Sequence, residues 1–102
     1  MAPEVIAGYK YTEKADVFSF GIILWELLTR QPPYIGIDGT EVSLKVVRED
    51  LRPKISRESE TTAPPQFIDL MKRCWDRDPV KRPLFDEIIE TLINIDDIKS
   101  YN

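Results

Sequence analysis

Apolar residues along the chain gather into four segments of helical character, and breaks that contain proline or glycine separate them. The first strong segment runs from about Lys14 to Thr29, with Thr12 as a suitable N-cap and Pro32-Pro33 beyond its end. A helix that is apolar on all sides is normally buried inside something larger. We therefore expect this segment to be the central helix of the fold. Its apolar positions cover almost the whole circumference of a helix: Val17, Phe18, Phe20, Ile22, Ile23, Leu24, Trp25, Leu27 and Leu28.

In the middle of the chain, the periodicity of apolar residues is weaker. A loop is predicted from Tyr34 to Thr40, because this stretch contains two glycines. Between Thr40 and Asp50 the pattern is ambiguous, because alternating apolar residues suit a strand while two adjacent valines suit a helix. The stretch from Leu51 to Pro65 is polar and bounded by prolines, which predicts a long surface loop.

The last third of the chain predicts two amphipathic helices. The first has apolar residues at positions i, i+3, i+4 and i+7, namely Phe67, Leu70, Met71 and Cys74. The second has one apolar face, made of Phe85, Ile88, Ile89, Leu92 and Ile95. Between them, Asp78-Pro79 predicts a cap followed by a short helical turn. No pair of strands emerges, so the predicted fold class is all-α.

Composition narrows the functions that this chain can have. It has 102 residues, a formal net charge of -4 and 42% hydrophobic residues, which suits one soluble globular domain with a modest core. The acidic balance argues against nucleic acid as a partner. No apolar run reaches the ~20 residues that a membrane helix needs, and no charged-then-apolar leader stands at the start. We therefore expect no nucleic acid partner and no membrane contact for this chain.

The scarcity of reactive side chains excludes several kinds of enzyme. The chain contains a single cysteine, Cys74, and no histidine. One cysteine cannot form an internal disulfide framework or a cysteine-based zinc site, and without histidine there is no Ser-His or Cys-His nucleophile. Cys74 lies on the apolar face of its predicted helix, so we expect an inert, buried thiol. Composition thus removes most of the common sets of catalytic residues.

Four motifs, taken in order, resemble the back half of the large lobe of protein kinases. Met1-Ala2-Pro3-Glu4 matches the Ala-Pro-Glu motif that closes the activation segment of the family. The run from Lys14 to Leu28 is similar to the central helix of that lobe, and Pro32-Pro33-Tyr34 to the turn after it. The order and spacing of all four motifs agree, and together they cover nearly the whole chain. The fourth resembles the last conserved block of the family, in Cys74-Trp75-Asp76, Asp78-Pro79 and Arg82-Pro83.

The family signatures that precede these motifs are absent from the chain. It has no Gly-rich phosphate loop, no strand lysine with a glutamate partner, no His-Arg-Asp catalytic loop and no Asp-Phe-Gly metal motif. The resemblance therefore implies that residues 1–102 are a partial protein kinase domain, which begins at the exit of the activation segment. It also implies that ATP and Mg²⁺ belong to the full parent domain, and that the missing N-terminal part of the domain is a partner of this chain.

The resemblance implies roles for a few residues. In the family, the Glu of Ala-Pro-Glu pairs with the Arg of the last block, which implies a buried ion pair between Glu4 and Arg82. Asp16 corresponds to the acid that accepts backbone N–H bonds from the catalytic loop. Because that loop is absent from this chain, we expect its carboxylate to lie near apolar surface with only water to bind. Trp25 and Trp75 are expected to anchor the core.

Two functions are compatible with these features. The first is the C-terminal part of a protein kinase whose parent transfers the γ-phosphoryl group of ATP to a protein hydroxyl. The chain would then supply structural support and, around Pro33 to Asp50, docking for protein substrates or regulators. The motifs look most like tyrosine-kinase-like Ser/Thr kinases, with true tyrosine kinases a close second. We expect a cytoplasmic protein, or the cytoplasmic side of a membrane receptor.

The second function is a non-catalytic helical interaction module or a pseudokinase remnant. The coding sequence upstream of residue 1 would separate the two. An intact Lys, His-Arg-Asp and Asp-Phe-Gly set would favour the enzyme, and its absence would favour the module.

The central helix also predicts self-association. In a whole large lobe other helices cover it, whereas the remaining segments of this chain are apolar on one side only. A contiguous exposed apolar patch is rarely tolerated by a soluble monomer, and pairing with a second copy would cover it in a homo-oligomer. We expect the patch to consist of some of the residues Val17, Phe18, Phe20, Ile22 and Trp25.

Overall fold

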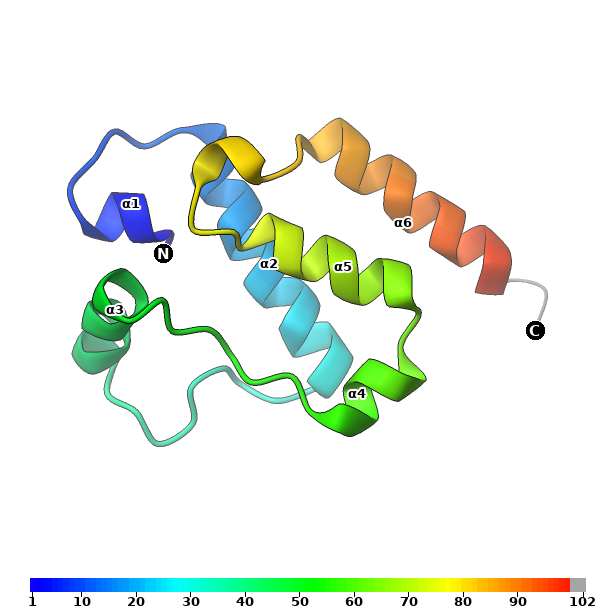
Figure 1. Ribbon diagram of the computed structural model, residues 1–102, viewed down its shortest axis with the longest axis horizontal. Helices are drawn as coiled ribbons and strands as arrows, with labels where there is room; N and C mark the ends of the chain where they lie inside the picture. Colours follow the sequence, from blue (N-terminus) through cyan, green and yellow to red (C-terminus); the bar gives the residue numbers. More distant parts are fainter. Residues whose placement is uncertain (100–102) are drawn as a thin grey trace.

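Helices account for the regular structure of residues 1–99, which are the residues that the computed structural model describes. Figure 1 shows α5 crossing α2, α6 lying alongside α5, and α1 next to α3. No strand occurs within residues 1–99, so the all-α prediction is confirmed. The elements are α1 (Pro3–Ile6), α2 (Glu13–Thr29), α3 (Gly39–Arg48), α4 (Arg57–Thr62), α5 (Pro65–Cys74), the 3₁₀ turn η1 (Pro79–Lys81) and α6 (Phe85–Lys99).

Local signals define both ends of the central helix α2. The hydroxyl oxygen of Thr12 accepts a hydrogen bond from the backbone N–H of Lys14 at 3.3 Å, as the predicted N-cap requires. At the other end Arg30 adopts the left-handed conformation with φ 56°, and its N–H donates to the carbonyl oxygen of Glu26. The two prolines that follow cannot continue the helix.

The core lies where α5 packs along α2. Gly21 allows this close approach, because a Cβ atom at that position would lie 2.9 Å from the Cβ atom of Cys74 and 3.1 Å from the carbonyl oxygen of Met71. The side chains of Val17, Phe18 and Leu24 on α2 are buried in the core cluster that α5 shares. α6 adds Ile88 to the same cluster.

Three helices were not predicted from the sequence, or were predicted only as one of two alternatives. The prediction of a loop throughout Leu51 to Pro65 is wrong at α4, a helix that Ser56 caps by accepting from the N–H of Ser59 at 3.1 Å. This helix is polar on every side, so the sequence contains no periodic pattern of apolar residues that would predict it. The ambiguous stretch is the helix α3, which Asp38 caps. The short helix α1, which begins at Pro3, was not predicted.

The exposed part of α2 differs from the predicted patch. Val17, Phe18 and Trp25 are buried, and Phe20 and Ile22 are half-buried. The exposed apolar residues of α2 are instead Ile23 and Leu27, at 47% and 66% exposure, and α6 exposes Phe85, Ile89 and Ile93. The shape of the chain explains why these residues stay exposed. The Cα atoms span only 15 Å along the shortest axis, so there is no room for helices on both sides of α2.

Candidate functional site

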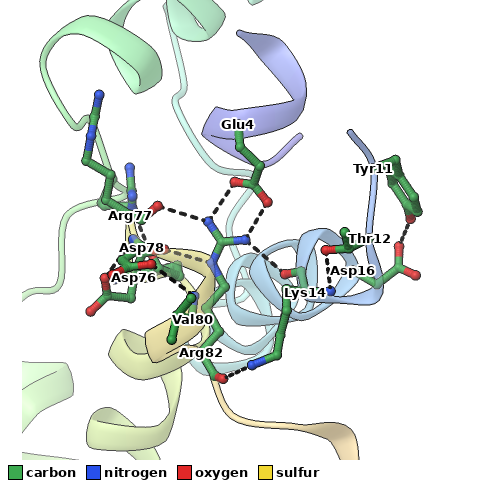
Figure 2. Close-up of polar contacts among 12 residues, drawn as sticks. Glu4, Tyr11, Thr12, Lys14, Asp16, Asp76, Arg77, Asp78, Val80 and Arg82 are labelled. Carbon is green, nitrogen blue, oxygen red and sulfur yellow. Dashed lines mark hydrogen bonds and ion pairs between the residues drawn. The ribbon is translucent and has the colours of Figure 1, made fainter. Parts of the chain in front are cut away.

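The side chain of Arg82, in the last third of the chain, binds the side chain of Glu4, which lies 78 positions earlier in the sequence. Its Nη1 and Nη2 atoms donate to Oε2 and Oε1 of Glu4 at 2.8 and 2.9 Å, which is bidentate geometry (Figure 2). Three further donations go to the carbonyl oxygens of Asp76, Lys14 and Arg77 at 2.7, 2.9 and 3.4 Å. All five N–H groups of the guanidinium therefore have acceptors. Lys14 in turn donates from Nζ to the carbonyl oxygen of Arg82 at 2.5 Å.

The ion pair is largely removed from water. The Arg82 side chain is 0% exposed and the Glu4 side chain 15% exposed. Burial alone would raise the pKa of the Glu4 carboxyl, but the hydrogen bonds and the charge of Arg82 outweigh it and lower the pKa below its ordinary value. The pair thus holds α1, the first turn of α2 and the segment between α5 and α6 in one arrangement.

A second arginine, Arg52, lies half-buried in the loop between α3 and α4 and also contacts Phe18. The guanidinium carbons of Arg52 and Arg82 lie 4.8 and 5.0 Å from the centroid of the Phe18 ring, which is the geometry of a cation–π contact. Arg52 also donates to the carbonyl oxygen of Trp75 at 2.9 Å and pairs with Asp50 at 2.9 Å. Burial lowers the pKa of Arg52, and the charge of Asp50 partly offsets this. The sequence analysis missed Arg52, because an Arg-Pro dipeptide in a polar stretch resembles an ordinary surface loop.

Asp16 has a partner that the sequence analysis did not foresee. It lies exposed in the first turn of α2, where its Oδ1 atom accepts a hydrogen bond from the hydroxyl of Tyr11 (Figure 2). This hydrogen bond raises the pKa of the Tyr11 hydroxyl, since it stabilises the protonated phenol. The expectation that Asp16 has only water to bind is therefore wrong, because the loop before α2 brings Tyr11 to its carboxylate.

The two tryptophans and the cysteine are buried. Trp25 and Trp75 are 6% and 7% exposed, and the indole Nε1–H of Trp25 donates to the carbonyl oxygen of Lys54 at 2.9 Å. Burial raises the pKa of the Cys74 thiol to about 12. The fraction of reactive thiolate at neutral pH is correspondingly small.

Neither a metal site nor a membrane-spanning helix is found in the described part of the chain. Nowhere among the side chains of residues 1–95 do three or more His, Cys, Asp or Glu converge in a way that could hold a metal ion. Likewise, none of the described helices combines the length and the apolar character needed to cross a bilayer.

Comparison with known proteins identifies the family of this all-helical chain. The sequence profile of the family described as protein tyrosine and serine/threonine kinase matches residues 1–92, so the chain belongs to that family. The resemblance seen in the motifs is confirmed.

Several curated relatives carry kinase names. The probable serine/threonine-protein kinase drkB of Dictyostelium discoideum is 45% identical over 93% of this chain. Serine/threonine-protein kinase STY17 of Arabidopsis thaliana is 47% identical over 90% of it. The putative serine/threonine-protein kinase/receptor R831 of Acanthamoeba polyphaga mimivirus is 45% identical over 93%. The matched region spans only 13%, 15% and 6% of these relatives, respectively.

Proposed function

We propose that residues 1–102 are the C-terminal part of a protein kinase catalytic domain, whose parent transfers the γ-phosphoryl group of ATP to a protein hydroxyl. The observation that carries this proposal is the family match over residues 1–92. Serine or threonine is the favoured acceptor, because the relatives named above are serine/threonine-protein kinases. ATP and Mg²⁺ are assigned to the parent domain, since the chain contains none of the motifs that hold them.

Within such a parent, this chain supplies support and docking rather than chemistry. Supporting this role, the Glu4–Arg82 pair holds the segment at the exit of the activation segment against the last helical block. Asp16 stands at the start of α2 with its carboxylate exposed, where an incoming backbone N–H could replace the Tyr11 hydroxyl as donor. The region from Pro33 to Asp50 is the proposed docking region for protein substrates or regulators.

The missing N-terminal part of the domain is the proposed partner for the exposed apolar face. We use the name α2–α6 face for the exposed apolar residues of these two helices taken together, namely Ile23 and Leu27 on α2 and Phe85, Ile89 and Ile93 on α6. Burying such a face stabilises by about 25 cal/mol for each Å² of apolar area removed from water. The parent would act in the cytoplasm or on the cytoplasmic side of a membrane receptor.

A chimera tests the proposed function. The part of STY17 that precedes the aligned region would be joined to residue 1, and transfer of labelled phosphate from ATP to a generic protein substrate would be measured. We expect transfer by the chimera, and neither transfer nor micromolar ATP binding by the 102-residue chain alone, because positioning of the phosphates depends on the upstream motifs.

The control is the same chimera with Arg82→Ala, which should lose activity together with stability. A chimera that melts cooperatively but transfers no phosphate would contradict the proposed function and favour a non-catalytic interaction module.

A further inference from the structure

A cleft of about 440 Å³ opens between the end of α2 and the loops on either side of α3. Its volume lies within the range of roughly 300–1,000 Å³ that is typical of ligand sites. Ile35 stands at this cleft with 68% of its surface exposed and so adds accessible apolar area to the wall. The wall is mainly apolar and includes Trp25, Tyr34, Ile35, Ile37, Leu51 and Pro53.

The charged side chains that line the cleft are both cationic, although the chain as a whole carries a formal charge of -4. Arg52 is already neutralised by Asp50 at 2.9 Å. Lys54 is exposed and makes no ion pair within 4.0 Å in the part of the chain that the structure describes. Lys54 also lines a neighbouring polar hollow, and Glu58 belongs to the wall of that hollow but not to the wall of the cleft. The cleft therefore offers an apolar surface beside one positive charge that makes no ion pair among the described residues.

The backbone of the loop that forms the cleft adopts an uncommon conformation. Tyr34 has φ 59° and Gly36 has φ 81°. Positive φ is rare for a bulky aromatic residue and is concentrated at functional sites. This loop conformation accompanies the exposure of Ile35 and the half-burial of Tyr34 at the cleft.

We propose that this cleft binds a segment of a partner protein in which an apolar side chain stands next to carboxylates. The apolar side chain would contact the wall around Trp25 and Ile35, and a carboxylate would pair with Lys54. Gln31 and Ser56 line the same cleft and provide polar groups for the backbone of the segment. This inference rests on the proposed docking role of the Pro33–Asp50 region and names the chemistry of the partner.

Trp25 provides a direct reporter of binding, because its indole N–H bonds to the carbonyl oxygen of Lys54 at the cleft. The 102-residue chain labelled with ¹⁵N would be titrated with three blocked tripeptides. The first has a central phenylalanine between two glutamates, the second has lysines in place of the glutamates, and the third has alanine in place of the phenylalanine. Trp75, which does not line the cleft, is the internal reference.

We expect the glutamate–phenylalanine peptide to shift the Trp25 indole signal and leave that of Trp75 unchanged. An exposed ion pair is worth about 0.2–1 kcal/mol, so the lysine peptide should bind about 1.4- to fivefold more weakly. Lys54→Glu should reverse this preference, whereas Lys10→Glu, the same charge change in an exposed loop that does not line the cleft, should preserve it. Ile35→Ser should weaken binding of both phenylalanine peptides by about threefold or more, because apolar contact is lost.

Three results would overturn the proposal. The first is equal binding of the glutamate and lysine peptides, and the second is a preference between them that Lys54→Glu leaves unchanged. The third is a Trp25 indole signal that shifts with protein concentration in the absence of peptide, which would assign the cleft to a second copy of the chain. The titration needs neither ATP nor the upstream domain. A failure here therefore leaves the chimera result standing, and an inactive chimera leaves the peptide result standing.

Discussion

At the scale of single residues, Arg82 is the side chain whose removal should cost most. Arg82→Ala would leave the Glu4 carboxylate partly buried without its partner, so we expect a loss of ~3–5 kcal/mol in the free energy of unfolding, measured by urea denaturation. Glu4→Ala combined with Arg82→Ala should cost less than the sum of the two single changes.

The matched control for this experiment is Arg73→Ala. Arg73 pairs with Glu87, but the two side chains are 39% and 50% exposed. Water screens such a pair, and we expect a loss below ~1 kcal/mol. Similar losses for Arg73→Ala and Arg82→Ala would show that burial of the Glu4–Arg82 pair is not what stabilises the fold.

The same pair predicts a pH dependence. The pKa of Glu4 in the folded chain is lowered from the ordinary value of 4.5, so the folded state binds fewer protons near that pH than the unfolded state. The stabilisation that the Glu4–Arg82 pair provides is therefore fully present at pH values above the pKa that Glu4 has in the unfolded chain. It is lost as the pH falls through the lower pKa that Glu4 has in the folded chain. The difference in urea midpoint between the wild type and Glu4→Gln should be constant above about pH 5.5 and shrink below about pH 4.5. A difference that stays constant down to pH 3 would contradict the lowered pKa.

At the scale of elements, the packing of α5 on α2 depends on the absence of a side chain at Gly21. Gly21→Ala would place a Cβ atom 2.9 Å from the Cβ atom of Cys74 and 3.2 Å from the backbone nitrogen of Trp75. Overpacking costs about 1–3 kcal/mol, which exceeds the ~1 kcal/mol of helix propensity that alanine adds. We expect a lower melting temperature for this variant.

Gly39→Ala is the control for the substitution at Gly21. Gly39 is the first residue of α3, and a Cβ atom there would meet no atom within 4 Å. Alanine should be neutral or stabilising by up to about 1 kcal/mol. If the two variants melted at the same temperature, close helix approach at Gly21 would not be the reason for a glycine there.

At the scale of the whole molecule, the chain is a thin plate that leaves apolar surface uncovered. Its radius of gyration is 14.2 Å, against about 13 Å for a compact domain of this length. We expect the isolated chain to self-associate or to bind a hydrophobic dye at micromolar concentration, through the α2–α6 face. Light scattering and dye fluorescence are the measurements.

A double variant tests whether self-association and dye binding occur through the α2–α6 face. Leu27→Gln combined with Ile89→Gln changes two residues that are 66% and 54% exposed, so the fold should persist. We expect dye binding and scattering mass to fall. A monomeric, dye-negative wild-type chain would show that the face is tolerated without a partner.

The sequence by itself determined which segments are helices wherever a helix has an apolar side. Local patterns in the sequence follow directly from helix geometry. Examples are the apolar residues on all sides of α2, the N-cap Thr12 before it, and the apolar stripes of α5 and α6. The helix α4 escaped detection because it is polar on all sides and only the Ser56 cap marks it. The pairing of Glu4 with Arg82 was inferable from the family motifs alone, since no periodicity connects residues 78 positions apart.

Tertiary structure alone decided which side of α2 is covered and which polar groups meet. The close approach at Gly21 directs α5 against Val17 and Leu24, and leaves Ile23 and Leu27 exposed. The half-burial of Arg52 and the cleft beside Trp25 both depend on how the loops around α3 lie against α2. Such contacts join segments that are distant in sequence, and their free energies depend on packing and burial, which a one-dimensional pattern does not contain.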